Sequence, residues 1–292
     1  MASKVILAVF VLCFYGCLHD AAGQNTILWS VDDRESGNRS YLLGTFHQMG
    51  STWVDSLTKV IEALSDAELA VFESIDPAED LAASMNRRPS DFSYRDRLKS
   101  GDVEWLEEYT ANWAVPLEKL RPMELHWKLN QLKARDVCKT SGPEDRFDHF
   151  DNYLIYIADS LGIPTVGLET DSMQADMINE KIGENTWGAL RRVIHGDVRT
   201  LRLGREKRGS CAFARLYMDL KIGDYPLDES CDQTGPVIAD RNRAWMDELP
   251  DLLRNHRCFV AVGLMHLFYD CGLITALREA GFVVMPVRDL RG

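Results

Sequence analysis

Short apolar segments recur along the chain, and each of them is bounded by residues that favour turns. Short apolar segments that are bounded and rich in residues that favour strands are typical of buried β-strands. We expect such strands at residues 40–43, 69–72, 164–166 and 258–262, and a further one at residues 282–287. Residues 26–31 are expected to pair with the strand at 40–43 as a hairpin.

Amphipathic helices are expected between these strands, because apolar residues recur there at helical spacing. The clearest stretches are residues 53–64, 150–161, 187–201 and 273–277. Strands that alternate with helices predict an α/β fold with mixed or parallel β-sheets and flanking helices. Residues 75–149 contain no clear strand, and we expect them to form a helical cap or insertion within a single domain that covers residues 24–292.

The first residues of the chain have the layout of a cleavable signal peptide. Lys4 precedes an apolar run at residues 5–18, and small residues follow at 21–23, so we expect residues 1–23 to be removed. The mature chain has no apolar run long enough to cross a bilayer, and therefore no membrane span is expected. These features predict a secreted protein, or a periplasmic one if the source is a bacterium.

Several residues are candidates for covalent modification in a secreted protein. The cysteines that remain after the signal peptide are disulfide candidates: Cys138, Cys211, Cys231, Cys258 and Cys271. Their odd number leaves at least one that is free or bonded to another chain. Cys211 and Cys231 flank a loop-like stretch and are the expected pair. Asn38 begins an Asn-Arg-Ser sequon, which predicts N-glycosylation if the source is eukaryotic.

Polar side chains follow the predicted strands at the point where each strand ends. In the order of the strands at 40–43, 69–72, 164–166 and 258–262, they are His47, Glu73, Glu169 and His266. Ligands of open α/β sheets bind beyond the carboxyl ends of the strands, so we expect these side chains to share a site. Residues 42–47 also resemble residues 261–266, since each is an apolar strand followed by Gly-x-x-His. The repeat indicates two related halves.

Two imidazoles and a carboxylate are the ligand set of many divalent-metal hydrolases. Such an ion lowers the pKa of a bound water from about 15.7 to about 7, which supplies hydroxide at neutral pH. We expect His47, His266 and Glu169 to hold the metal. Glu73 follows its strand directly and should point into the cleft, so we assign it the role of general base. Arg241 is the candidate for binding a substrate carboxylate or an oxyanion.

Each of these residues also has a purely structural interpretation. A single Gly-x-x-His occurs often by chance, and Glu73 and Glu169 could interact with helix N-termini. Arg241 and Arg243 are typical of a solvated helix face. The functional interpretation is favoured because the two histidines and two glutamates, His47, Glu73, Glu169 and His266, all lie at equivalent strand ends. The remaining histidines of the mature chain are expected to be structural: His126, His149, His195 and His256.

Charge and missing motifs argue against several classes of function. The net charge is −12 and no basic stripe is present, which argues against nucleic acid as a partner. The chain contains no Gly-x-Ser-x-Gly, His-Glu-x-x-His, P-loop or Gly-x-Gly-x-x-Gly motif. A serine esterase of the α/β-hydrolase type, a zincin and a Rossmann dinucleotide enzyme are therefore not expected.

The same residues resemble those of the TraB/GumN family, which includes the TIKI metalloproteases. The resemblance covers most of the mature chain and is carried by residues 41–47 with 71–73, by residues 151–170, and by residues 241–284. It implies an α/β fold with two related halves, similar to the erythromycin-esterase and ChaN-like superfamily. In the TIKI branch it implies proteolysis supported by manganese or cobalt, with Wnt proteins as substrates.

The resemblance also implies which positions carry the activity. In the family the metal-dependent activity maps to the two Gly-x-x-His motifs, and therefore to His47 and His266 in this chain. Residues 241–242 match a family Arg-Asn pair, whereas Glu73 and Glu169 match its acidic positions less exclusively.

The chain departs from the family at Phe46 and Gln48, where many members have smaller aliphatic residues, and at residues 268–271, where a short Gly-containing turn is common. TIKI proteins are membrane-tethered and no tether is expected in this chain, so Wnt proteins do not follow as substrates.

Two functions from different classes fit these observations. The first is a secreted metal-dependent hydrolase, a peptidase that acts on peptide or protein substrates. It would use manganese or cobalt, as the resemblance suggests, or zinc. The second is a non-catalytic protein that binds and sequesters a peptide or haem, since both histidines could act as ligands without turnover.

Overall fold

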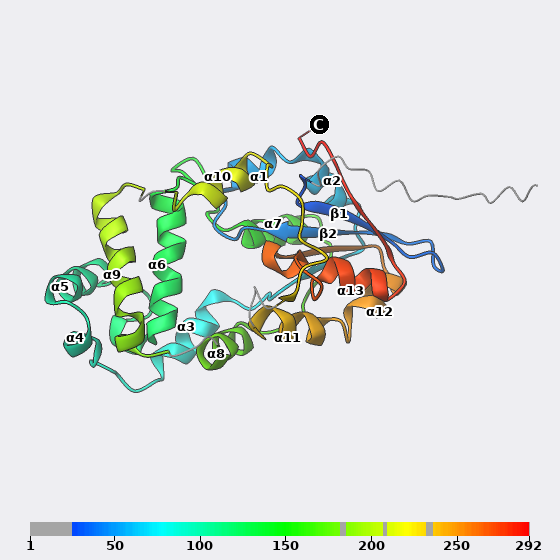
Figure 1. The fold of residues 1–292 in the computed structure, drawn as a ribbon. Helices are drawn as coiled ribbons and strands as arrows, with labels where there is room; N and C mark the ends of the chain where they lie inside the picture. Colours follow the sequence, from blue (N-terminus) through cyan, green and yellow to red (C-terminus); the bar gives the residue numbers. More distant parts are fainter. Residues whose placement is uncertain (1–24, 182–184, 207–208, 232–235, 292) are drawn as a thin grey trace, which may run out of the picture.

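The computed structural model describes residues 25–181, 185–206, 209–231 and 236–291 (Figure 1). A β-sheet with its surrounding helices forms one side of the molecule in Figure 1, and a group of helices that includes α6 and α9 forms the other. The predicted signal peptide, residues 1–23, lies outside the described residues. Within the described ranges, no helix combines the length and the apolar character needed to cross a membrane.

A mixed sheet in the order β4-β3-β5-β2-β1-β6 forms the centre of the fold. Its strands are β1 (Leu28–Asp32), β2 (Arg39–Thr45), β3 (Leu69–Phe72), β4 (Thr165–Gly167), β5 (Cys258–Gly263) and β6 (Val283–Pro286). β4, β3, β5 and β2 are parallel, while β1 pairs antiparallel with both β2 and β6. Every predicted strand is present, including the hairpin, and the predicted α/β fold class is confirmed.

The two central strands bring the Gly-x-x-His motifs side by side. β2 and β5 pair in parallel, with Gly44 opposite Val262 and Thr45 opposite Gly263. β5 is buried along its whole length, as expected for a central parallel strand. Because parallel strands end at the same edge of a sheet, both motifs leave the sheet at its carboxyl edge.

Helices around the sheet complete one large hydrophobic core. They are α1 (Ser51–Asp55), α2 (Thr58–Ser65), α7 (Phe150–Ser160), α11 (Pro236–Trp245), α12 (Leu249–Asn255), the 3-10 helix η3 (Leu264–Leu267) and α13 (Leu273–Glu279). α7 contacts β3 and β4, and α13 contacts β6. The stretch expected as one helix at residues 53–64 forms two short helices, with Leu57 in a non-helical conformation between them.

A second group of helices has a hydrophobic core of its own. It includes α3 (Ala78–Asn86), α4 (Tyr94–Arg97), α5 (Ser100–Tyr109), the 3-10 helix η1 (Leu117–Lys119), α6 (Pro122–Asp136) and α9 (Trp187–Leu203). α8 (Asp171–Lys181) and α10 (Ala212–Met218) connect it to the rest of the chain. Residues 75–149 contain helices and no strand, as expected, but the helical layer extends beyond them because α9 supplies part of its core.

Two predicted structural histidines join the helices of this layer. His126 Nδ1 lies 2.7 Å from Asp197 Oδ2, which connects α6 to α9. His195 Nδ1 lies 2.8 Å from Asp102 Oδ2, which connects α9 to α5. Both carboxylates are buried, so these hydrogen bonds satisfy polar groups inside the helical layer.

The disulfides differ from the predicted pair. Cys138 is bonded to Cys211 and Cys231 to Cys271, with Cα–Cα distances of 5.3 and 5.8 Å, so the predicted Cys211–Cys231 bond is wrong. Cys138 follows the end of α6 and Cys211 precedes α10, and the fold brings these helix ends together. Cys258 is the free, buried thiol that the odd number requires, and burial raises its pKa to about 12.

Removing the Cys138–Cys211 bond should destabilise the protein. The bond closes a loop with a sequence separation of 73 residues. A Cys138→Ala/Cys211→Ala variant should lose about 2–4 kcal/mol of unfolding free energy in urea denaturation, because the unfolded chain becomes freer. Mass spectrometry of the unreduced wild type should find both observed pairs, and a peptide that links Cys211 to Cys231 would contradict this fold.

Candidate functional site

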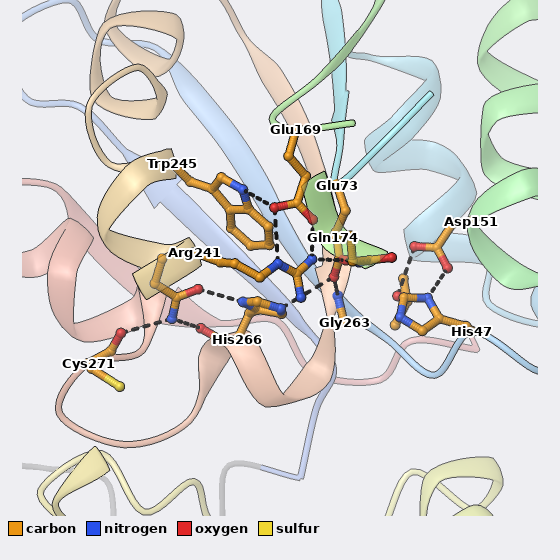
Figure 2. A network of polar contacts seen from close by, with 12 residues as sticks. His47, Glu73, Asp151, Glu169, Gln174, Arg241, Trp245, Gly263, His266 and Cys271 are labelled. Carbon is orange, nitrogen blue, oxygen red and sulfur yellow. Dashed lines mark hydrogen bonds and ion pairs between the residues drawn. The ribbon is translucent and has the colours of Figure 1, made fainter. Parts of the chain in front are cut away.

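The carboxyl ends of β2, β3 and β5 bring polar side chains together (Figure 2). Glu73 follows β3 directly, His47 lies just beyond β2, and His266 lies in η3 after β5. The Gly263 N–H donates to Glu73 Oε1 at 2.6 Å, and His266 Nε2 lies 3.6 Å from the same oxygen. One oxygen of Glu73 therefore lies between the end of β5 and the His266 ring.

The orientation of His266 is fixed by Asn242. The Asn242 amide nitrogen donates to the backbone carbonyls of His266 at 3.1 Å and Cys271 at 2.9 Å. Its oxygen must therefore be the acceptor for His266 Nδ1, 2.6 Å away, so Nδ1 carries the proton and Nε2 keeps its lone pair. The ring packs on Trp245 and is only 2 % exposed, and burial lowers the pKa of His266 to about 3. His266 is thus a neutral imidazole that presents Nε2 to Glu73.

His47 is held in the same way by a carboxylate. Its Nδ1 lies 2.6 Å from Asp151 Oδ2, and the other oxygen of Asp151 accepts from Thr45 Oγ1 at 2.9 Å. Burial opposes protonation of His47, but the charge of Asp151 and the hydrogen bond to it outweigh burial and raise the pKa of His47 to about 9. A ring that donates Nδ1–H to a carboxylate again presents Nε2 to the site.

Gly263 allows these groups to approach the backbone. A Cβ atom at this position would lie 3.1 Å from Glu73 Oε1 and 3.3 Å from His47 Nε2. Gly44, the equivalent residue of the first motif, faces Leu264, whose Cδ1 would lie only 2.5 Å from such a Cβ atom. Close packing at the sheet edge therefore favours glycine at both positions, because a larger residue would force the neighbouring side chains to shift.

Arg241 joins the two glutamates that follow β3 and β4. Its guanidinium donates to Glu73 Oε2 at 2.5 Å and to both oxygens of Glu169 at 2.6 and 3.0 Å. The Gln174 amide donates to Glu73 Oε2 at 3.0 Å, and the Trp245 indole donates to Glu169 at 3.3 Å. Arg241 is only 4 % exposed, so the guanidinium lies inside the protein and not on a solvated helix face.

The two glutamates differ in their protonation equilibria. Burial alone would raise the pKa of Glu73, but the positive charges of Arg241 and His47 and the N–H of Gly263 hold it well below its usual range. Burial raises the pKa of Glu169, although Arg241 opposes this shift. The surroundings of Glu73 therefore stabilise a carboxylate anion next to the imidazoles.

The structure brings some of the predicted site residues together and separates others. His47, Glu73 and His266 lie around the end of β5, as described above. Both oxygens of Glu169 accept hydrogen bonds from Arg241, so this carboxylate is directed to the guanidinium. Its expected role as a metal ligand stays a prediction.

Three supporting residues were not identified from the sequence as part of the site: Asp151, Asn242 and Gln174. Asp151 lies in the first turn of α7, where an acidic residue is common for helix stability alone. Asn242 follows Arg241 in the Arg-Asn pair that the family resemblance identified, and this pair was the sequence signal that could have placed Asn242 in the site.

His149 lies beside His47, although it was expected to be structural. The two rings stack with centroids 5.4 Å apart, and His149 Nδ1 is buried without a hydrogen-bond partner. Single ligand atoms of His47, His149 and Asp151 lie within 4.8 Å of one another, which is close enough for one metal ion. His47 thus lies in a compact group with His149 and Asp151, whereas the ligand atoms of His47, Glu73 and His266 do not all lie within that distance of one another.

The residues at this edge suit a divalent cation. Both imidazoles of the Gly-x-x-His motifs have Nδ1 bonded to an oxygen acceptor, which is the usual arrangement of metal-binding histidines. Asp151 is bonded to His47 and Glu73 lies beside His266, while Arg241 is bonded to Glu73 and Glu169. The remaining negative charge favours a cation next to the imidazole nitrogens.

Replacing Arg241 with Met should destabilise the protein at neutral pH. The change leaves Glu73 and Glu169 buried without their cation, which costs about 3–5 kcal/mol of unfolding free energy. Urea denaturation measures this loss. Arg243→Met is the matched control, because Arg243 lies on the same helix with a side chain that is 76 % exposed, and its loss should be within about 0.5 kcal/mol.

The loss of unfolding free energy in Arg241→Met, relative to the wild type, should become smaller as the pH falls. In the wild type the pKa of Glu73 is lowered despite its burial, so this contribution to stability is present above the ordinary carboxyl pKa of about 4.3 and is lost as the pH falls through the folded-state value. In the variant the unpaired carboxylates can bind protons, which removes the buried charge. An equal deficit at about pH 7 and about pH 4 would contradict this account.

Comparison with known proteins agrees with the resemblance seen in the sequence. The chain matches the TraB/PrgY/gumN family over residues 27–286, which is nearly its whole length. No curated protein and no solved structure matches it. Because the family match spans almost the entire chain, this protein belongs to the TraB/PrgY/gumN family.

Proposed function

We propose that this chain is a secreted metal-dependent hydrolase, and specifically a peptidase that acts on peptide or protein substrates. The observation that carries the proposal is the arrangement of the two Gly-x-x-His histidines. Each ring is fixed through Nδ1, and His47 and His266 present Nε2 at the end of β5, where Glu73 Oε1 also lies.

His47, His266 and Glu73 are the residues that we propose to hold the ion. Glu73 Oε1 is close to His266 without any rearrangement, whereas Glu169 would have to leave Arg241. The lowered pKa of Glu73 also suits a ligand, because a general base works best with a pKa near the working pH. We therefore reverse the roles expected from the sequence, so that Glu73 is a ligand and Glu169 positions it through Arg241.

A divalent ion, manganese or cobalt as the resemblance suggests or zinc, would lower the pKa of a bound water to about 7 and polarise a carbonyl oxygen. The protein's own groups orient the ligands for this chemistry. Asp151 and Asn242 keep a proton on Nδ1 of the two imidazoles, and Arg241 holds Glu73. Arg241 is thus a positioning residue in this proposal, since its guanidinium is already bonded to both glutamates.

The choice of a peptide bond rests on the resemblance to the TIKI metalloproteases. A non-catalytic peptide- or haem-binding protein is the alternative, and it would need the histidines but no turnover. Peptide cleavage that depends on an added metal ion separates the two functions.

Secretion is supported by two disulfides, which form and persist in oxidising compartments. We expect amino-terminal sequencing of the protein from the culture medium to begin at or near Gln24, because the predicted signal peptide ends at Gly23. Secreted material that begins at Met1 would contradict this. N-glycosylation at Asn38 stays a prediction; the side-chain amide of Asn38 donates to the Arg254 carbonyl at 2.8 Å.

Replacing either His47 or His266 with Ala should abolish tight binding of Mn²⁺ and metal-dependent cleavage of peptides. Both effects follow from loss of an Nε2 ligand. We expect the affinity for Mn²⁺ to fall by more than about 100-fold while the fold stays intact. Because ligands act as a unit, the double variant should be little worse than either single one. Titration calorimetry and a peptide-cleavage assay with and without a chelator measure the two properties.

Matched variants identify the rest of the ligand set. Glu73→Gln should lose Mn²⁺ like the histidine variants, whereas Glu169→Gln should weaken binding by about 10-fold or less, since it acts through Arg241. His256→Ala, at an exposed histidine, controls for loss of an imidazole. Retained binding in His266→Ala together with loss in His149→Ala would place the ion with His149 and Asp151, and would overturn the proposed ligand set.

A further inference from the structure

A pocket of about 460 Å³ lies between α3, α6 and α8. Its apolar lining includes Leu81, Met85, Trp113, Val115, Trp127 and Ile178. The volume lies within the range of roughly 300–1,000 Å³ that is usual for pockets that bind small ligands. Trp127 remains 40 % exposed, so the pocket offers apolar surface to solvent.

The pocket lies at the carboxyl edge of the sheet, next to the candidate metal site. Two helices of the pocket wall follow site residues along the chain: α3 starts shortly after Glu73, and α8 starts shortly after Glu169. Gln174 joins the two regions directly: it is a lining residue of the pocket, and its amide donates to Glu73 Oε2 at 3.0 Å. A substrate whose reacting bond lies at Glu73 would therefore have its neighbouring groups at the mouth of this pocket.

Three charged residues line the pocket: Glu124, Lys128 and Asp171. The Glu124 side chain lines it, but its oxygens accept from Arg88 at 2.8 and 2.9 Å and from Asn179 at 2.8 Å. The same carboxylate also accepts from the Arg121 N–H at 2.7 Å. A carboxylate that is paired in this way does not attract a cationic ligand, and the apolar side chains of the lining favour an apolar group.

We propose that this pocket binds a large apolar side chain of the substrate, aliphatic or aromatic, close to the bond that is cleaved at the metal site. The inference rests on the proposed peptidase function and gives it a substrate class. Polar groups at the pocket, among them Lys128, Gln131 and Asp171, can bond the backbone amides of a peptide. Burial of one large apolar side chain should favour such a peptide over its Ala analogue by roughly 10- to 100-fold in kcat/KM.

The test introduces a larger side chain from α3 into the pocket and compares variants at two neighbouring alanines of this helix. Ala82 lines the pocket, whereas Ala83 on the same helix is exposed and does not. Ala82→Leu should reduce the preference for peptides with Leu or Phe over the Ala analogue to within about threefold, while Ala83→Leu should keep it. Ala78→Leu, which also lines the pocket, is a second filling variant. Cleavage of the Ala peptide should be unchanged in Ala83→Leu, which lies outside the pocket.

A binding measurement without metal keeps this inference separate from the proposed function. Trp113 and Trp127 line the pocket, so their fluorescence should report binding of the Leu and Phe peptides to metal-free protein. Selective binding that Ala82→Leu removes would support the pocket even if no peptide is cleaved, and the absence of cleavage would then overturn only the peptidase proposal. Equal binding of all peptides, or binding of octanoate in preference to peptides, would overturn the assignment of the pocket.

Discussion

The Arg241 guanidinium connects three parts of the protein that are distant in the sequence. It projects from α11 and bonds Glu73 at the end of β3 and Glu169 after β4. Buried charges are tolerated when every one of them is paired and hydrogen-bonded. In this network a backbone N–H, a glutamine amide and an indole N–H supply the remaining donors to the two carboxylates. The position of Glu73 beside His266 depends on these bonds.

The two histidines of the site differ in charge because their partners differ. Asn242 offers His266 an amide oxygen without a full charge, so burial decides the protonation of that ring and keeps it neutral. Asp151 offers His47 a carboxylate, whose field favours a positive charge at that ring. One imidazole therefore has a free lone pair at neutral pH, and the other lies in a field that attracts a cation. Both properties are useful to a site for a divalent metal.

The sequence was sufficient for features that depend on local patterns. Strands were predicted correctly because their apolar runs are short and bounded, three of them by a glycine, and the residues that follow β2, β3 and β5 lie at the sheet edge. The cysteine pairing was not predictable, since it depends on how α6 meets α10 in space. The burial of Arg241 could not be predicted from the sequence either. Arg241 and Arg243 lie in the same local pattern, but only Arg241 faces the glutamates.

The proposed chemistry and the proposed substrate recognition lie in different layers of the fold. The proposed ligands follow strands of the sheet, whose core is continuous, whereas much of the pocket wall comes from helices that pack around a second core. Substitutions at Ala82 or Leu81 can change the pocket without moving a strand end. Gln174 is the exception, because it lines the pocket and also bonds Glu73. A substrate that displaces Gln174 would change the surroundings of Glu73, so binding in the helical layer would affect the proposed metal site through this one amide.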